Sequence, residues 1–272
     1  MARAPARVRV SAVGGPAKVS FDADLNACAA LVERGDPLRF RCAMAAPVAA
    51  RRVLFPLYAL NVEVSRAPWV TQETMIAEMR LQWWRDALEE IAGGGAVRRH
   101  EVVTPLAAVL SPDHARLLDA TIAARRWDIY REPFEDEAHF AHYIDQTSGH
   151  LMWIAASTLG HAEETTVRRA AYASGIAAWL RAIPELEAAK RVPLLDGTAD
   201  GVRNLATIAL SRLRQARRAR ATVSPPARPA LLPAAAAGPV LKAASGDPSR
   251  VADGTLPEPA LGFTLRAATG RW

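Results

Sequence analysis

The sequence predicts an all-α protein with a single domain. Three observations carry this prediction: apolar residues recur at spacings of three and four, capping residues stand before several of these runs, and no alternating strand pattern or Asn-Gly turn occurs. The chain has 272 residues, of which 50% are hydrophobic and 23% are charged. This composition suffices for a substantial core and excludes a disordered chain or a coiled rod.

The predicted helices follow one another along the chain. A cap residue stands before a proline at Asp36-Pro37 and at Ser111-Pro112, a pattern typical of helix starts. We expect helices over these ranges: 22–34, 47–66, 71–93, 112–131, 135–159, 163–182 and 199–219.

Two of these helices carry clear apolar stripes. The helix that begins at Thr71 ends at Gly93–Gly95, and its stripe predicts one buried face made of Met75, Ile76, Met79, Trp83, Ala87 and Ile91. The helix over 47–66 has a similar stripe, made of Val53, Leu54, Leu57, Tyr58, Leu60 and Val64.

Composition divides the chain into three parts. Residues 1–20 are basic and lack acids, and we expect a disordered arm there. Residues 21–218 form the helical domain. Residues 219–272 are rich in alanine and proline, and such a density of proline predicts only short helical pieces, over 229–237 and 239–244. We expect this last part to be a helical flap of the same domain.

The charge balance and the cysteines bear on location and partners. The formal net charge is +6, and the arginines between Arg212 and Arg220 have no interleaved aromatic residues, so a nucleic-acid partner is not expected. No apolar run reaches the roughly 18 residues of a spanning helix, and no secretory signal is evident. Cys28 and Cys42 are typical of reduced core residues. We expect a location in the bacterial cytoplasm, with peripheral contact at the inner face of the membrane, or on the matrix side of a mitochondrion.

Residues that could indicate a metal site, a hydrolase or a phosphate loop lack the neighbours that these sites need. His139 and His142 share a helix face but lack the glutamate of an HExxH motif. Ser148-Gly149-His150 lacks the strand before it that a nucleophile elbow needs. No glycine-rich phosphate loop is present.

Four segments together make the sequence familiar: RFRCAMAAPVAARR at 39–52, FPLYALNVEVSR at 55–66, YIDQTSGHLMWIAASTLG at 143–160 and GIAAWLRAIPELEAAKRVPLL at 175–195. Over about residues 25–200 the chain resembles the squalene/phytoene synthase family. The resemblance implies an isoprenoid-synthase-type helical bundle with a central apolar cavity. It also implies the joining of two prenyl diphosphates with the help of magnesium.

The metal-binding motifs of that family are absent from this sequence. Magnesium prefers oxygen ligands, and aspartates at i and i+4 place two carboxylates on one helix face. The resemblance places one such pair at Ser65 and Trp69 and the second at Ala182 and Leu186, and none of these residues is acidic. We therefore expect no metal and no other cofactor. Pro184 inside the second motif is expected to kink or end its helix.

The replacement pattern is itself similar to a divergent branch of the family. FPLYALNVEVSR, TQETMIAEMRLQWWRDALEEI and LRAIP resemble the branch that includes the mitochondrial assembly factor of respiratory complex I. This resemblance implies a non-catalytic protein that assists complex I assembly. Its expected partners are complex I subunits or assembly intermediates, with an isoprenoid or lipid as ligand.

The resemblance and the polar residues on apolar stripes suggest a degenerate site. Its expected members are Arg51, Tyr58, Asn61, Glu63, Ser65, Arg80, Trp83, Trp84, Gln146, Arg181, Ala182 and Leu186. We expect an ion pair between Arg181 and Glu63 across the emptied metal site, because a buried charge needs a partner. Ordinary core packing is the alternative role for four aromatic residues expected to line the cavity: Trp83, Trp84, Tyr143 and Trp153.

Two other functions stay open at this point. One is a prenyltransferase of the squalene or phytoene synthase type that condenses prenyl diphosphates with magnesium. The other is a peripheral lipid-binding module that uses the basic arm and the arginines from Arg212 to Arg220.

Overall fold

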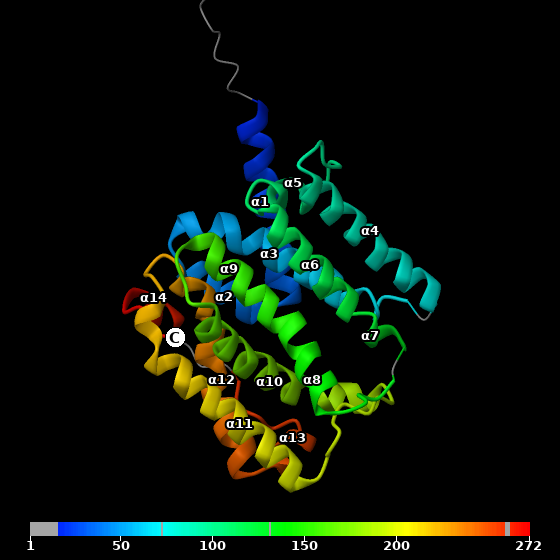
Figure 1. Ribbon diagram of the computed structural model, residues 1–272, viewed down its shortest axis with the longest axis vertical. Coiled ribbons are helices and arrows are strands. Elements are labelled where there is room, and N and C mark those ends of the chain that lie inside the picture. The colour runs from blue at the N-terminus through cyan, green and yellow to red at the C-terminus, as the bar shows by residue number, and fades with distance from the viewer. Residues whose placement is uncertain (1–15, 72, 131, 259–261) are drawn as a thin grey trace, which may run out of the picture.

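The computed structural model describes residues 16–71, 73–130, 132–258 and 262–272. The arm expected over 1–20 falls on residues 1–15, which lie outside this part, and on the start of the first helix. The described residues form helices joined by short connections, with one isolated bridge between Ala162 and Val223 (Figure 1). The α-helices are α1 (Pro16–Gly35), α2 (Pro37–Ala45), α3 (Val48–Arg66), α4 (Thr74–Gly93), α5 (Val103–Ala107), α6 (Pro112–Ala124), α7 (Trp127–Tyr130), α8 (Glu137–Ile144), α9 (His150–Leu159), α10 (Glu164–Ala188), α11 (Ala199–Arg218), α12 (Pro233–Gly246), α13 (Ser249–Ala252) and α14 (Phe263–Ala268). A π-helical turn, η1 (Asp145–Gly149), joins α8 to α9, and two 3₁₀ turns are η2 (Arg220–Thr222) and η3 (Arg228–Leu231).

Helix α10 runs through the middle of the bundle (Figure 1). It packs against α9 and η1 on one side and against α11 and α12 on the other. Helix α3 packs against α1, α5 and α9, so the expected family segments surround a common centre. The all-α prediction is confirmed.

Several helix ends follow the local signals in the sequence. The Asp36 carboxylate accepts a hydrogen bond from the backbone N–H of Arg39 at 2.9 Å, and the Ser111 hydroxyl accepts one from His114 N–H at 3.2 Å. The helix expected from Thr71 begins at Thr74 instead. The helix expected over 135–159 is interrupted by η1, which no local signal predicts.

Two prolines lie inside helices that we expected them to end. Helix α10 continues for one turn beyond Pro184, and α12 passes through Pro239 as one helix instead of two pieces. A proline removes one backbone N–H, but burial of the flanking residues compensates for the lost hydrogen bond. Leu180, Leu186 and Leu241 are buried around these positions. Neither helix ends at its proline, which corrects the expected end at Pro184 and the expected division into two pieces before Pro239.

Only two of the six residues of the stripe expected to be buried on α4, Ala87 and Ile91, are buried; the other four face outward. Met75, Ile76, Met79 and Trp83 are exposed, whereas the face packed against α6 consists of Ala77, Leu81, Trp84, Ala87, Leu88 and Ile91. Helix α4 therefore has two apolar stripes. Spacing alone does not say which one meets a neighbour.

The alanine- and proline-rich end of the chain packs on the main bundle. Helix α12 contacts α10 and α11, and its alanines allow a close approach. Trp272 is buried, and the Arg217 guanidinium donates a hydrogen bond to its carbonyl oxygen at 2.9 Å. Both free cysteines, Cys28 and Cys42, are buried, and within the described residues no helix has the length and apolar character to cross a membrane.

Candidate functional site

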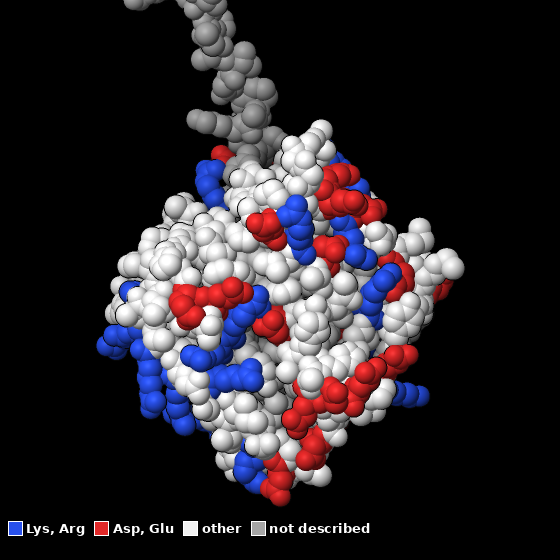
Figure 2. Space-filling model, in the orientation of Figure 1, with Lys and Arg blue, Asp and Glu red and all other residues white. Residues whose placement is uncertain are grey.

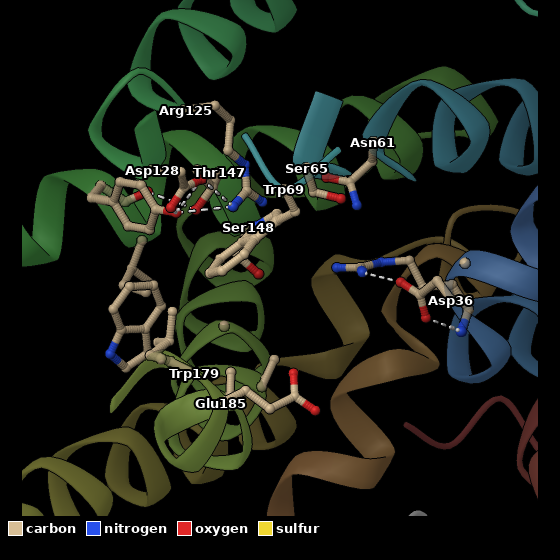
Figure 3. A pocket seen from close by; sticks show the side chains of 18 residues that line it. Asp36, Asn61, Ser65, Trp69, Arg125, Asp128, Thr147, Ser148, Trp179 and Glu185 are labelled. Carbon is tan, nitrogen blue, oxygen red and sulfur yellow. Dashed lines mark hydrogen bonds and ion pairs between the residues drawn. The ribbon is translucent and has the colours of Figure 1, made fainter. Parts of the chain in front are cut away.

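A cavity of about 540 Å³ lies between α3, η1, α10 and the turn between α1 and α2 (Figure 3). Its lining combines apolar, neutral polar and charged side chains: Gly35, Asp36, Arg39, Asn61, Ser65, Trp69, Arg125, Asp128, Tyr143, Ile144, Thr147, Ser148, Gly175, Ala178, Trp179, Ala182, Glu185 and Leu186.

All four positions at which the resemblance places metal-binding aspartates line this cavity. Ser65 lies near the end of α3, with Trp69 in the connection after it, and Ala182 and Leu186 lie on α10. Asn61, one turn before Ser65, completes the row on α3. The fold thus retains the two facing walls of the expected site, with other side chains on them.

The carboxylates that do line the cavity do not fit a magnesium site of that kind. Asp36, Asp128 and Glu185 come from three separate elements, so none forms a pair on one helix face. Asp36 is 2.5 Å from Arg39, and Asp128 is 3.2 Å from Arg125. Among the described residues, no group of three or more His, Cys, Asp and Glu side chains is arranged to hold a metal ion.

A cation lies against Trp69, the second residue of the first expected metal-binding pair. The buried Arg191 side chain lies with its guanidinium carbon 4.7 Å from the centre of the Trp69 ring, and the same side chain donates to the carbonyl oxygen of Asp128. A cation over an aromatic face is a favourable contact. Trp69 and Arg191 together put an aromatic ring and a positive charge where the family would carry a carboxylate.

One wall of the cavity holds a buried ionic network. The Tyr143 hydroxyl donates to the Asp128 carboxylate at 3.0 Å, and the Arg125 guanidinium donates to the Tyr143 oxygen at 2.9 Å. Burial raises the pKa of Tyr143 far above its usual value, so its hydroxyl stays protonated and donates. Asp128 is buried, and Arg125 supplies its countercharge.

Aromatic rings close the same wall. Trp127, Phe134, Tyr143 and Trp179 contact one another with ring centres 4.1 to 5.8 Å apart. The Trp179 indole N–H donates to the carbonyl oxygen of Pro193 at 2.9 Å, which fixes the ring in the wall.

The π-helical turn brings backbone and hydroxyl groups to the cavity. Thr147 and Ser148 line the cavity from η1, and α10 approaches them at Gly175. A Cβ atom on Gly175 would lie 2.9 Å from the Ser148 Cβ, so only glycine allows this approach. Such π-helical turns are frequent at functional sites.

Arg39 separates this cavity from a second one of about 370 Å³. Both cavities share Gly35, Asp36, Arg39 and Ala178 as lining residues. The Asp36 carboxylate that caps α2 also holds the Arg39 guanidinium, which lies 5.7 Å from the Tyr58 ring centre. Burial raises the pKa of Tyr58 above its usual value, so this buried hydroxyl is neutral.

Arg181 has a partner other than the one expected. Its guanidinium lies 2.5 Å from Glu258 and donates to the carbonyl oxygen of Pro257 at 2.8 Å, beside the second cavity. The expected Arg181–Glu63 pair is not formed, because Arg181 is directed toward the C-terminal segment. Glu63 is half-buried outside the cavity lining.

Some of the other expected site residues line the first cavity, and the rest lie outside it. Asn61, Ser65, Ala182 and Leu186 line the first cavity, with Tyr58 buried next to it under Arg39. Those outside it are Arg51, Arg80, Trp83, Trp84, Gln146 and Trp153. Arg51 donates to carbonyl oxygens at the end of α2, and Arg80 and Trp83 lie exposed on α4. Of the four expected aromatic residues, only Tyr143 lines the cavity.

Sequence reasoning missed Arg39, Arg125, Asp128 and Trp179. Arg125 and Asp128 are three residues apart next to Trp127, a charged pair in a stretch otherwise rich in apolar residues. That pattern is the signal that could have indicated a buried ion pair.

The bundle and its cavity define the all-α isoprenoid synthase fold. A crystal structure of a dehydrosqualene synthase in complex with ligand matches with a TM-score of 0.74, covering 92% of this chain and 97% of that chain at 12% identity. The chain belongs to the squalene/phytoene synthase family, whose family model matches residues 32–194. The family resemblance expected from the sequence is confirmed.

Curated relatives narrow the comparison further. The chain is 30% identical over 181 residues to the Drosophila melanogaster homolog of NADH dehydrogenase (ubiquinone) complex I, assembly factor 6, which covers 61% of this chain and 54% of that protein. It is 24% identical over 191 residues to the Homo sapiens assembly factor 6, covering 64% of this chain and 53% of that protein. The chain spans about half the length of the curated relatives it matches.

Proposed function

We propose that this chain assists the assembly of respiratory complex I as a non-catalytic protein with the squalene/phytoene synthase fold. The observation that carries the proposal is that all four positions expected to hold aspartates line one cavity and carry Ser65, Trp69, Ala182 and Leu186 instead. The assignment to complex I assembly comes from the curated relatives, which are named complex I assembly factor 6.

The charges around the cavity support a role without prenyl transfer. Ionising a prenyl diphosphate requires stabilisation of about three negative charges on the leaving group, which magnesium supplies as a Lewis acid. Arg39 and Arg125 are each paired with an aspartate, so their charge is already compensated. The proposed function needs no metal and no other cofactor.

The proposal includes a ligand for the cavity. A space of about 540 Å³ with an aromatic wall on one side is suited to an isoprenoid or lipid chain. The proposed partners are complex I subunits or assembly intermediates. Contact with them would occur at the inner face of a bacterial membrane, or on the matrix side in a eukaryote.

A gene deletion tests the assembly role. We expect the deletion strain to lose complex I activity and the assembled complex, with squalene and carotenoid content unchanged. Normal complex I in that strain would overturn the proposal.

Complementation of the deletion strain tests the ligand. Ala182→Trp fills the cavity, whereas Ala188→Trp places the same side chain at an exposed position near the end of α10. We expect Ala188→Trp to restore complex I and Ala182→Trp to fail, with both proteins present at equal levels. Full restoration by both variants would remove the ligand from the proposal and leave the assembly role.

An assay with purified protein tests the absence of catalysis. The chain is incubated with farnesyl or geranylgeranyl diphosphate and magnesium, and pyrophosphate is measured against a boiled control. We expect no release above the control. Release would establish a prenyltransferase in spite of the missing aspartates.

A further inference from the structure

Helix α4 presents an apolar face to solvent. Met75 is 74% exposed, Met79 is 66% exposed and Trp83 is 37% exposed, with Ile76 beside them. At 3.6 residues per turn these four side chains fall within about 100° of the helix circumference. We name them the α4 face. The opposite side of the same helix packs against α6, so the α4 face is a second stripe without a neighbour in the described part of the chain.

The aromatic member of the α4 face is held in place. The Trp83 ring lies edge-on to Trp84 at 4.8 Å and tilted to His100 at 5.1 Å, and the Arg98 guanidinium covers it at 4.9 Å. Arg98 is itself fixed by an ion pair with Glu90 at 2.7 Å. Protein interfaces are enriched in tryptophan and methionine, and here a tryptophan held by its neighbours lies next to two flexible methionines.

Carboxylates border the α4 face. Tyr130 is exposed, and its hydroxyl bonds to Glu78, which places it beside α4; Glu132 follows two residues further along the chain. Figure 2 shows acidic side chains in a line over the segment between α7 and α8, on the side of the molecule where α4 lies. This segment, residues 132–137, holds four carboxylates and no basic residue.

The basic side chains nearby pair with carboxylates outside the segment 132–137, one of them Glu78 on α4 itself. Arg126 is paired with Glu78 at 2.8 Å, and Arg85 is paired with Asp119 at 2.7 Å. Arg80 is the remaining exposed arginine on α4. The border of the α4 face is therefore predominantly acidic.

We propose that the α4 face docks an amphipathic helix of a partner protein, one with an apolar stripe flanked by lysine or arginine. The apolar stripe would cover Met75, Met79 and Trp83, and the basic flanks would meet the segment 132–137. An anionic membrane surface fits less well, because its headgroups carry the same sign of charge as the border. A second copy of this chain on the same face would bring two acidic borders together.

Methyl NMR on the full chain tests the proposal without reference to complex I. The chain is labelled at its methionine methyl groups and titrated with a synthetic helix of leucine and lysine in an amphipathic pattern. We expect the Met75 and Met79 signals to shift, with Met44, which lies on another helix, and the buried Met152 unmoved. The matched helix of leucine and glutamate should leave all signals in place.

Two variants sharpen the test. Met75→Gln together with Met79→Gln should weaken binding of the lysine helix at least about tenfold, and Met44→Gln should leave it unchanged. Glu132→Gln together with Glu135→Gln should weaken binding and reduce its dependence on salt.

Four results would overturn the proposal. The first is an absence of shifts at Met75 and Met79 with the lysine helix. The second is an equal effect of the glutamate helix, which would show binding without charge selection. Shifts with vesicles of phosphatidylglycerol and phosphatidylcholine would assign the face to a lipid surface. Shifts that follow the concentration of the chain alone would assign it to self-association. None of these results bears on the proposed assembly role, which the deletion strain tests separately.

Discussion

The buried pair of Arg125 and Asp128 provides the sharpest test of the energetics around the cavity. Replacing Arg125 by methionine keeps most of the side-chain volume and removes the countercharge of Asp128. The side chains of the pair are only 18% and 6% exposed. Loss of one partner of a buried pair costs about 3 to 5 kcal/mol, because the other charge remains buried without compensation.

The chain contains a matched control for this change. Arg116 and Asp113 form an ion pair with the same residue types and the same spacing of three, but their side chains are 65% and 88% exposed. Arg116→Met should lower the free energy of unfolding by less than about 1 kcal/mol. The difference between the two variants therefore measures the effect of burial together with the contact of Arg125 to Tyr143.

Urea unfolding followed by circular dichroism measures both variants. We expect Arg125→Met to lose about 3 kcal/mol or more, and the double variant Arg125→Met/Asp128→Leu to recover part of that loss, since no buried charge is left unpaired. Equal effects of Arg125→Met and Arg116→Met would refute the reasoning. A double variant less stable than Arg125→Met would refute it as well.

Three further predictions concern buried groups. Burial lowers the pKa of His150 below its usual 6.5, so the unfolded chain takes up the proton more readily. The free energy of unfolding should therefore fall as the pH drops from 7 to 5, with a shallower slope in His150→Gln. Burial raises the pKa of Cys28 and Cys42 to about 12, so both thiols should resist Ellman's reagent at pH 8 until urea unfolds the chain. Gly175→Val should lower the free energy of unfolding by about 1 to 3 kcal/mol, because its side chain would overlap Ser148.

One result would contradict each of these three predictions. An unchanged pH slope in His150→Gln would remove that histidine from the acid sensitivity. Rapid labelling of the folded chain would contradict the burial of the thiols. For the glycine, the companion change Ser148→Gly should restore part of the stability, and its failure would show that the contact with Ser148 is not the cause.

Local sequence signals predicted much of the helical framework. The ranges 47–66 and 199–219 agree closely with α3 and α11, since each carries one apolar stripe and clear ends. In α4 two stripes compete, and only the packing of α6 decides between them. The π-helical turn η1 also lacks a local signal, and it lies where α10 approaches closely at Gly175.

The candidate site was predicted in part. The resemblance brought Ser65, Trp69, Ala182 and Leu186 to one cavity, because the family framework fixes which helix faces meet. The ionic contacts could not be derived from spacing. Glu258 is 77 residues from its partner Arg181. Such long-range partners depend on the path of the chain.

The ion pair that caps α2 has a consequence for any guest molecule. Because Arg39 borders both cavities, its side chain acts as a partition between two chambers. The isoprenoid or lipid chain proposed for the first chamber would meet this partition, and a turned Arg39 would join the two chambers toward α12. Asp36, which caps α2 and pairs with Arg39, would thereby limit the length of the proposed guest.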